Sequence, residues 1–415
     1  MQNKLLVKTI VGIVVIGALF TGYRAFNEFS ADPDLGDFNS VGALAAIETS
    51  REGARAVIFS ADGKRIDPPK ASKSDAQDVE VTWTADGQRL FLSSNRESAS
   101  FTVHRWNPTS QKVEARGLAG RSQGAPFFAP GEGRGDALLV SGGYVLEYNQ
   151  RLRTTRQLLP PVLKEATTTE EGGGRASPLD SIYQRFGTSF RFARWAEDRE
   201  SIWAIMRGDE GEAALWNRLG TDPQGNLLPP IPIIRGRHLE MATVPGGKIV
   251  VLVRFLEFPP DEIPEQFIKN GRVELPWRHG LLLISPTPEG RLQTEMIGTF
   301  PPDMKEAFSD LAVSPDGSRL AVVVGEVRDD RSFDPKGLIV MPVAAGGVQQ
   351  ATPLVEGQIG RPAWSPDGRN VAFIKREGQF NNIYKVDVET GAESKVSTDG
   401  QFDYPVFSPQ LAASE

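Results

Sequence analysis

The chain has 415 residues, a net charge of −7, and ordinary globular proportions of 40% hydrophobic and 24% charged residues. It contains no cysteine, which excludes disulfides, thiolate metal sites, covalent haem attachment and a cysteine-linked lipid anchor. The acidic balance, without a basic stripe interleaved with aromatic residues, argues against nucleic acid as a partner.

The first predicted element is a single membrane-spanning helix over residues 5–23. This segment is apolar apart from Lys8 and two threonines, and a helix of its length spans about 28 Å, close to the hydrocarbon thickness of a bilayer. Lys4 and Lys8 lie at its start, so residues 1–4 are expected in the cytoplasm and the body outside. The alternative is a cleaved signal peptide, but no good small-residue cleavage site follows Phe20.

Residues 24–41 are predicted to be an acidic linker, and three short strands are predicted after it. Their approximate ranges are 42–48, 56–60 and 64–66, and Ala61-Asp62-Gly63 supplies the turn between the last two. These three strands lack a partner strand in their own neighbourhood of the sequence.

An internal repeat dominates the rest of the chain. Val81–Gly117 and Arg361–Ser397 each contain four short runs of β-branched or aromatic residues separated by turn residues, and a third copy begins at Val313. This pattern is typical of four-stranded antiparallel sheets. Between the first two runs stands a turn such as Ser365–Gly368, in which proline presets φ, aspartate accepts backbone N–H bonds and glycine supplies a positive φ. We assign these turns a structural role only.

The residue just before each such turn marks the end of a first strand. The seven marks are Trp83, Phe128, Trp195, Thr243, Val313, Trp364 and Phe407. The last mark supplies a first strand only, and the strands at 42–66 supply the missing three, which closes a ring and removes open sheet edges. We therefore predict an all-β, seven-bladed β-propeller over 42–408, followed by a tail at 409–415, with a six-bladed ring as the alternative.

These repeats resemble the WD-repeat-like β-propeller repeats of the TolB family of envelope proteins. Similar repeats occur in the propellers of prolyl-oligopeptidase-type peptidases. The resemblance covers roughly residues 42–408 and is specific in the three copies described above. It implies a propeller fold and an envelope location, and it carries over no activity and no site residue.

No catalytic, cofactor or metal site is predicted. The chain has no cysteine nucleophile and no Gly-x-Ser-x-Gly elbow. Its histidines, His104, His238 and His279, fall in different repeats without metal-ligand spacing. His104 is expected inside a third strand as an ordinary core side chain. No carboxylate pair stands out in the sequence, although propeller enzymes with sites in the central channel keep a hydrolase or lyase as an alternative.

Three insertions, at 160–189, 256–279 and 325–336, lengthen connections that share one face of a propeller. Loops grown on one face of a rigid scaffold commonly carry binding, and their aromatic and acidic residues suit a protein partner with a basic surface. Alternatively, the aromatic residues pack the insertion onto its own propeller. The predicted partner-binding residues are Phe258, Asp261, Glu262, Glu265, Phe267, Trp277, Asp329 and Asp330.

We therefore expect a single-pass protein of the inner (cytoplasmic) membrane with its propeller in the periplasm or outside the cell. Its expected role is a non-catalytic binding or scaffold subunit of a membrane or envelope complex, such as a secretion, transport, respiratory or photosynthetic assembly. The alternative is a free-standing enzyme or ligand sensor that uses the central channel. We expect no cofactor.

Overall fold

The structure is a computed structural model that describes most of residues 39–409. The longer segments outside the described residues are 1–38, 119–126, 131–136, 161–188, 257–264 and 410–415. The predicted membrane helix at 5–23 therefore lies outside them. Within the described part of the chain, no helix combines the length and apolar character needed to cross a bilayer.

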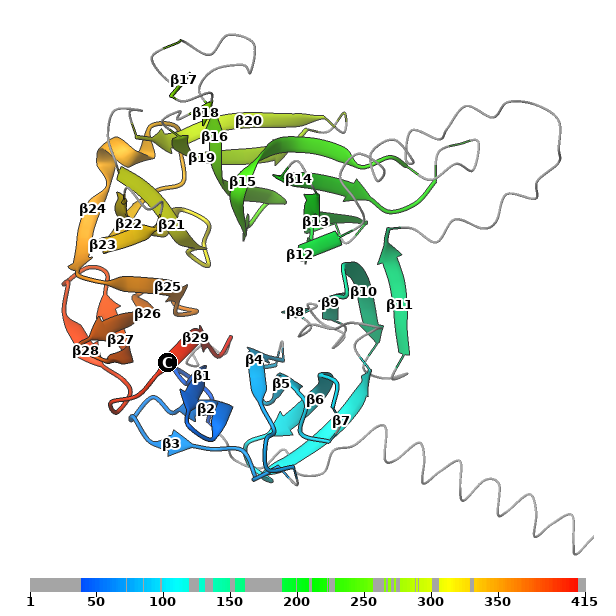
Figure 1. The fold of residues 1–415 in the computed structure, drawn as a ribbon, viewed down its shortest axis with the longest axis vertical. Helices are drawn as coiled ribbons and strands as arrows, with labels where there is room; N and C mark the ends of the chain where they lie inside the picture. Colours follow the sequence, from blue (N-terminus) through cyan, green and yellow to red (C-terminus); the bar gives the residue numbers. More distant parts are fainter. Residues whose placement is uncertain are drawn as a thin grey trace, which may run out of the picture. The chain divides into compact units, whose positions relative to one another are not determined.

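The described residues from 39 onward form a seven-bladed β-propeller, as predicted, and not a six-bladed one. The first strand of each blade lies nearest the centre of the ring (Figure 1). In spatial order, blade 1 contains β29 (Phe402–Phe407), β1 (Leu44–Ser50), β2 (Gly53–Phe59) and β3 (Arg65–Ile66). Blade 2 contains β4 (Asp78–Trp83), β5 (Leu90–Ser94), β6 (Thr102–Asn107) and β7 (Lys112–Leu118), and blade 3 contains β8 (Phe127–Pro130), β9 (Ala137–Ser141), β10 (Tyr144–Asn149) and β11 (Thr154–Leu159).

Blades 4 and 5 share one long strand. Blade 4 contains β12 (Ser189–Trp195), β13 (Ser201–Gly208), β14 (Gly211–Arg218) and the first half of β15 (Ile231–Val244). Blade 5 contains the second half of β15 with β16 (Lys248–Leu256), β19 (Trp277–Pro286) and β20 (Leu292–Thr299). Gly236 stands at the change of partner, where a Cβ would lie 2.5 Å from Val253 Cγ2 and 2.6 Å from the Arg254 carbonyl oxygen. The absence of a side chain there lets β15 pass directly from one blade to the next.

Blades 6 and 7 are the most regular copies of the repeat. Blade 6 contains β21 (Glu306–Val313), β22 (Arg319–Val327), β23 (Phe333–Pro342) and β24 (Thr352–Glu356), with a 3-10 turn η2 at Gly347–Gln350. Blade 7 contains β25 (Ile359–Trp364), β26 (Asn370–Glu377), β27 (Phe380–Asp387) and β28 (Glu393–Lys395). A separate two-stranded hairpin, β17 (Ile268–Lys269) with β18 (Arg272–Val273), belongs to the insertion after β16.

The core lies between neighbouring blades, because both faces of each sheet are covered. On β22, Leu320 and Val322 pack in the cluster shared with blade 5, whereas Ala321 and Val323 pack in the cluster shared with blade 7. Successive side chains of a strand point to opposite faces, so a nearly continuous apolar run is what a strand covered on both faces requires. This explains why the repeats show short apolar runs instead of strict alternation.

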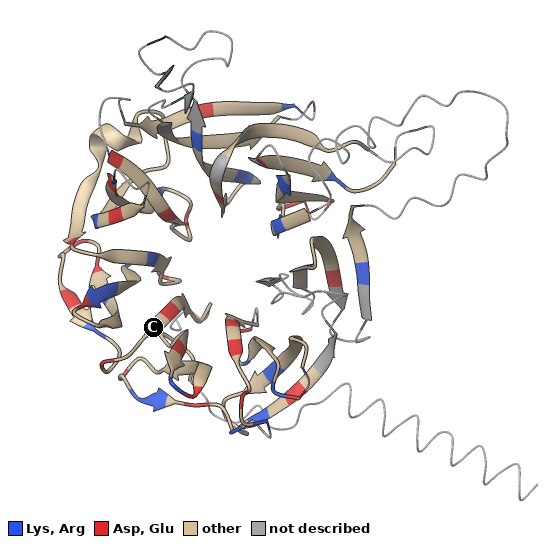
Figure 2. Cartoon of the chain, viewed as in Figure 1, with Lys and Arg blue, Asp and Glu red and all other residues tan. Residues whose placement is uncertain are grey.

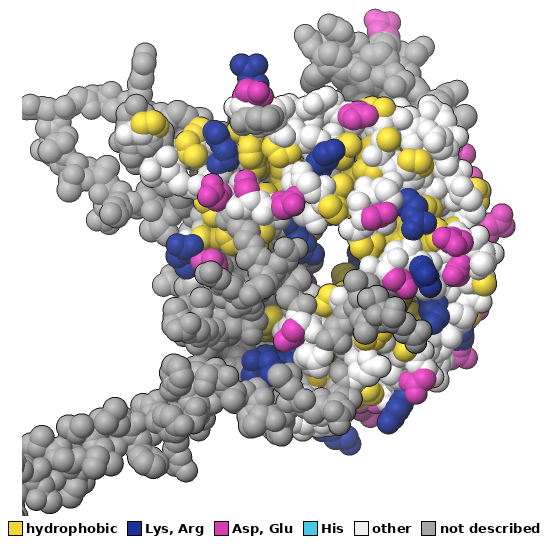
Figure 3. Space-filling view, turned by 180° about the vertical axis from the view of Figure 1, so that it is seen from behind, with side chains coloured by type: hydrophobic (Ala, Val, Ile, Leu, Met, Phe, Trp, Pro, Cys, Tyr) yellow, Lys and Arg dark blue, Asp and Glu magenta, His cyan; other side chains and the backbone are white. Residues whose placement is uncertain are grey.

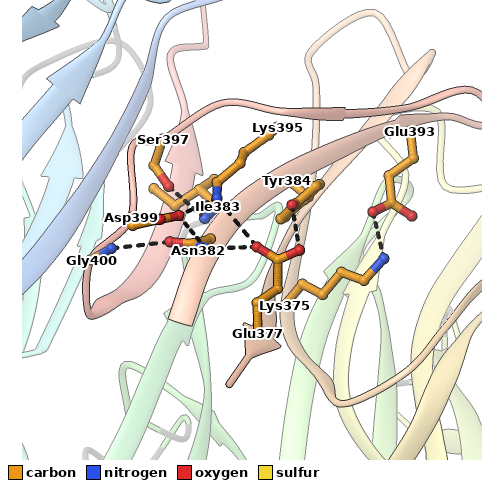
Figure 4. A network of polar contacts seen from close by, with 10 residues as sticks. All are labelled: Lys375, Glu377, Asn382, Ile383, Tyr384, Glu393, Lys395, Ser397, Asp399 and Gly400. Atoms are coloured by element: carbon orange, nitrogen blue, oxygen red, sulfur yellow. Dashed lines mark hydrogen bonds and ion pairs between the residues drawn. The ribbon is translucent and has the colours of Figure 1, made fainter. Parts of the chain in front are cut away.

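The ring closes as predicted, with the C-terminal strand inside blade 1. β29 pairs antiparallel with β1, and Leu44 lies opposite Phe407. A polar network at the edge of blade 7 holds the segment that leads into β29 (Figure 4). Asn382 donates to Glu377 at 2.8 Å and to Asp399 at 3.2 Å, and it accepts from the backbone N–H of Gly400 at 3.1 Å.

The turns after the first strands have the chemistry expected of them. Gly368 adopts φ 69° and donates its N–H to the Ser365 carbonyl at 2.9 Å. The Ser365 hydroxyl donates to Asp367 at 2.5 Å and accepts the N–H of Asn370 at 2.9 Å. The preceding tryptophan joins two blades, since Trp364 Nε1 donates to the Ala312 carbonyl of blade 6 at 2.9 Å.

One predicted insertion is mostly regular structure. The segment 325–336 was expected to interrupt the sheet of blade 6, but β22 and β23 continue into it and pair as far as Val327 with Phe333. Just beyond this pair, the Arg328 N–H donates to the Ser332 carbonyl at 2.9 Å. The polar residues of this segment therefore belong to a hairpin. Successive side chains of a strand point to opposite faces, and polar ones are accommodated where a face is exposed to solvent.

Candidate functional site

The innermost strands surround a central channel and are irregular at a common position. Six of the seven show a register shift against their neighbour: β4, β12, β15, β21, β25 and β29. In each case the residues at the C-terminal end of the innermost strand pair in regular register, so the shift lies before that end. A bulge of this kind re-aims a side chain and is frequent beside functional sites.

Three bulges place a non-glycine residue in the left-handed region. Asp310, Arg361 and Tyr404 have φ of 42°, 55° and 53°, and they belong to the consecutive blades 6, 7 and 1. Among the described residues only Gln111, in a hairpin turn, shares this property. Each such residue costs about 1–2 kcal/mol, and backbone strain of this kind clusters at functional sites.

Arg361 connects these three blades through its side chain and backbone. Its guanidinium contacts Asp310 of blade 6 at 3.4 Å and Asp403 of blade 1 at 3.2 Å. Its backbone N–H donates to the Asp310 carboxylate at 3.2 Å. The guanidinium also lies 4.5 Å from the centre of the Tyr404 ring, and Tyr404 as a residue is 45% exposed. Arg361 therefore holds two carboxylates and an aromatic surface at the channel wall.

Blades 4 and 5 continue the same polar chain. Arg191 Nε lies 2.7 Å from the Glu212 carboxylate, which also accepts the backbone N–H of Leu239 at 2.8 Å. Next along β15, burial raises the pKa of Glu240 to about 7, and the neighbouring Asp310 carboxylate acts in the same direction. We define the channel belt as Arg191, Glu212, Glu240, Asp310, Arg361, Asp403 and Tyr404. It contains four carboxyl groups and two guanidinium groups, and Figure 2 shows charges of both signs on the innermost strands.

The other end of the innermost strands surrounds a cavity of about 730 Å³. We call it the turn-face cavity, because its lining includes residues of the turns that follow β4, β12, β15 and β21. The space-filling view shows the ring hollowed at its centre, with charged side chains around the opening (Figure 3). Blades 1, 2, 4, 5 and 6 contribute to its lining, which includes Trp83, Trp195, Trp203, Phe407, Arg194, Glu197, Lys248 and Pro315.

The predicted partner-binding residues are not brought together by the described part of the structure. Glu265 is described and exposed, and Trp277 begins β19, although its side chain is not among the described ones. The others lie outside the described residues: Phe258, Asp261, Glu262, Phe267, Asp329 and Asp330. These eight residues remain a prediction.

The described histidines occupy structural positions. His104 is buried in β6, the third strand of blade 2 as predicted, with Nε2 2.8 Å from the Thr102 hydroxyl. His279 is buried in β19 with Nδ1 3.2 Å from the Phe308 carbonyl oxygen, and the side chain of His238 is not described. Within the described ranges, no group of three or more potential ligands could hold a metal ion.

The belt was missed from the sequence, although one signal for it was present. Arg361 and Tyr404 each precede a proline inside an innermost strand. Proline cannot donate to a sheet ladder and is confined to edges or bulges, so Pro362 and Pro405 mark two of the three strained positions. Asp310 carries no such mark. Contrary to the sequence analysis, a carboxyl pair can be singled out, namely Glu240 with Asp310.

No protein-family model matches the chain. Dipeptidyl-peptidase 5 of Porphyromonas gingivalis is 30% identical over 95 residues, which are 23% of this chain and 14% of that protein. The uncharacterized peptidase YuxL of Bacillus subtilis is 32% identical over 108 residues, which are 25% of this chain and 16% of that protein. The chain thus spans only a small part of these curated relatives.

Among solved structures, an oligogalacturonate lyase in complex with manganese aligns with 85% of this chain and 84% of its own, at 11% identity and a TM-score of 0.51. A protein from Bacteroides fragilis described as a putative 6-phosphogluconolactonase aligns with 90% and 98%, at 14% identity and a TM-score of 0.50. TolB from Acinetobacter baumannii aligns with 90% and 68%, at 13% identity and a TM-score of 0.48. The first two show the β-propeller fold alone.

Proposed function

We propose that this chain is a membrane-anchored, extracytoplasmic β-propeller that acts as a binding subunit of an envelope complex, and that its partner inserts a segment into the channel belt. The observation that supports this most directly is the left-handed conformation of Asp310, Arg361 and Tyr404 at equivalent places in three adjacent blades. Glycine would adopt this φ without strain. The strained residues therefore serve the side chains that they present, which are charged or aromatic.

The charge of the belt indicates what kind of segment enters. Four carboxyl groups face two guanidinium groups; Glu240, with a pKa of about 7, is only partly charged at neutral pH, and Arg361 is already shared between Asp310 and Asp403. A ligand with lysine or arginine side chains, or with a free amino group, adds the positive charge that this arrangement lacks. The exposed ring of Tyr404 offers an aromatic surface on which a cation or an apolar side chain can stack. A basic protein segment suits both features.

The test compares membrane-extracted complexes of the full-length chain with those of an Asp310→Asn, Asp403→Asn variant. Both substitutions keep the side-chain volume and remove charge from the belt. Asp67→Asn is the matched control, because Asp67 also pairs with an arginine, Arg65, and lies outside the belt. We expect the double variant to lose its stoichiometric partner at lower salt than the wild type and the control. Retention of the same partner at the same salt would contradict the proposal.

A second candidate is an acid–base enzyme that uses the same channel. Glu240 has a pKa of about 7 because of burial and of the Asp310 carboxylate. A carboxyl group poised near neutral pH beside a second carboxylate is what hydrolysis or elimination by general acid–base catalysis requires. An enzyme on this fold is also in keeping with the structural neighbours described as an oligogalacturonate lyase and a putative 6-phosphogluconolactonase.

A substrate screen with a matched variant separates the two candidates. Turnover by the full-length chain that disappears in Glu240→Gln, with a pH dependence near 7, supports the enzyme. Binding of a basic segment without turnover, weakened by Asp310→Asn, supports the binding subunit.

A further inference from the structure

We infer that the cationic group of the bound segment lies beside two carboxyl groups, Glu240 and Asp310, and takes the place of a proton there, so that binding releases a proton. This contact belongs to the binding function proposed above and rests on it. An affinity for basic segments that rises with pH follows from it, which charge attraction at the belt alone does not require.

Glu240 and Asp310 meet across the boundary between blades 5 and 6. The Glu240 carboxylate accepts the backbone N–H of Asp310, which is the residue with φ of 42° at the bulge of β21. The two carboxyl groups are also close enough for the Asp310 charge to raise the pKa of Glu240. Like charges at such a range disfavour the state in which both groups are ionised.

Both guanidinium groups of the belt are engaged with other carboxylates. Arg191 Nε lies 2.7 Å from Glu212. Arg361 is shared between two aspartates, with its Nε 3.2 Å from Asp403. Within the part of the chain that the structure describes, no ion pair includes Glu240. The side of the belt at Glu240 is therefore where a further cation can be added.

The groups that face Glu240 from the surrounding strands explain its titration. Burial is the largest cause of its raised pKa of about 7, and the Asp310 carboxylate follows, whereas Arg361 and Arg191 have smaller effects in the opposite direction. The other positions that face this part of β15 lie on β14 and β16: the ion-paired Glu212, the apolar Leu252 opposite Glu240, and Arg254, which is opposite Arg237. At pH 7 Glu240 is therefore protonated in about half of the molecules.

A cation beside this pair competes with the proton. An opposite charge within about 4–6 Å favours the ionised form of a carboxyl group, and an ammonium or guanidinium group also donates charge-assisted hydrogen bonds to carboxylate oxygens. The Asp310 side chain is 24% exposed and Glu240 is half-buried, so a ligand can reach both. Because the cation favours the form that has lost the proton, binding and deprotonation promote each other.

The experiment measures peptide binding to the full-length chain in detergent by calorimetry, with empty micelles as blank. The probe is acetyl-Gly-Lys-Phe-Gly-amide. We expect its affinity to rise about thirtyfold between about pH 5.5 and 8.5, because the pKa of Glu240 is about 7 in the free protein and lower in the complex. Repeating the titration in buffers of different ionisation enthalpy counts the protons, and about 0.9 proton per peptide should be released at about pH 6.

Three related peptides identify the cation at about pH 6.5. One has arginine in place of lysine, one has norleucine there, and one has norleucine together with a free amino terminus. They separate a guanidinium, no cation and a terminal ammonium group from the lysine side chain. We expect each cationic peptide that binds more tightly than the acetylated norleucine peptide to release a proton as it binds.

Three variants locate the proton. Glu240→Gln should bind the lysine peptide at every pH with the affinity that the wild type has at acid pH. Asp310→Asn should move the midpoint of the pH profile to lower pH, since a like charge is removed, whereas Asp403→Asn should leave the midpoint unchanged. Glu147→Gln is the matched control, because Glu147 also carries an ion pair and lies outside the belt. If Glu240→Gln fails to fold, the proton count and the two aspartate variants decide.

The outcomes separate this contact from the function on which it rests. An affinity that does not change with pH, or binding without proton release, would overturn the inference, although a preference for the lysine peptide over the norleucine peptide would still support the belt proposal. A midpoint that moves in Asp403→Asn but not in Asp310→Asn would also overturn it, because the cation would then lie elsewhere in the belt. If no cationic peptide binds better than the norleucine peptide at any pH, the belt proposal itself fails.

Discussion

Two glycines in equivalent turns allow the cost of a side chain at positive φ to be separated from the cost of a clash between blades. Gly317 and Gly368 have φ of 73° and 69°. A Cβ at Gly368 would have Arg319 Nη2, the end of a flexible side chain, as its nearest neighbour at 3.6 Å. A Cβ at Gly317 would lie 2.8 Å from Pro245 Cδ and 3.1 Å from Val244 Cγ1, both on the neighbouring blade.

Gly368→Ala should therefore report only the conformational cost. That cost is about 1–2 kcal/mol, reduced by about 0.4–1 kcal/mol because alanine also restricts the unfolded chain. Gly317→Ala adds an overpacking cost of about 1–3 kcal/mol, since a proline ring and a β-branched side chain yield little. We expect destabilisation of about 1 kcal/mol for the first variant and about 2–4 kcal/mol for the second.

The measurement is the urea midpoint of the full-length chain in detergent, followed by tryptophan fluorescence, with both variants at equal protein concentration. A midpoint for Gly317→Ala that lies no lower than that of Gly368→Ala would refute the close packing of the blade 6 turn on blade 5. Wild-type midpoints for both variants would refute the positive φ at these turns.

Three further expectations concern closure, a buried ion pair and pH. Deleting residues 401–415 removes β29 and leaves β1 with an open edge, so cooperative thermal unfolding should be lost; a wild-type melting temperature would contradict the closure. In the wild type, the buried Arg96 guanidinium lies 2.8 Å from the Asp78 carboxylate. Asp78→Ala removes this carboxylate and should lower the free energy of unfolding by about 3–5 kcal/mol, measured with denaturant. The double variant Asp78→Leu, Arg96→Met should lose less, because it leaves no unpaired charge in the core. The pKa of Glu240 is raised from 4.5 to about 7 in the folded state, so its stabilising contribution is complete below about pH 4.5 and is lost as the pH rises through 7. Glu240→Gln should therefore flatten the decline in urea midpoint between pH 5 and 8. If the variant shows the same decline as the wild type, other titrating groups cause it.

The fold could be predicted because its decisive signals are local. Proline, aspartate and glycine in a four-residue turn act on their own backbone, so the turns are readable without knowledge of the partners. The marks placed before them fall at or beside the ends of innermost strands: Trp83, Trp195, Val313, Trp364 and Phe407 are the last residues of β4, β12, β21, β25 and β29. The split blade followed from counting strands at both chain ends.

The channel belt could not be predicted in the same way, because its members come from different blades. Arg361 lies 51 residues from Asp310 and 42 from Asp403, and no local pattern places these side chains together. The raised pKa of Glu240 likewise depends on burial by strands distant in the sequence. For the segment 325–336 the sequence predicted an insertion, but most of it is a hairpin. Polar residues in a solvent-exposed hairpin resemble a loop when the strand that pairs with them is not considered.

The two ends of a single innermost strand show that the strained belt residues are there for their side chains. In blade 7, the turn at one end needs a positive φ and has Gly368 there, whereas the bulge at the other end has a positive φ at Arg361. The same contrast holds in blade 6 between Gly317 and Asp310. Glycine occupies the position where only backbone geometry matters, because it adopts this φ without strain. A charged residue that accepts the strain instead must contribute through its side chain, and in both blades that side chain belongs to the belt at the channel wall.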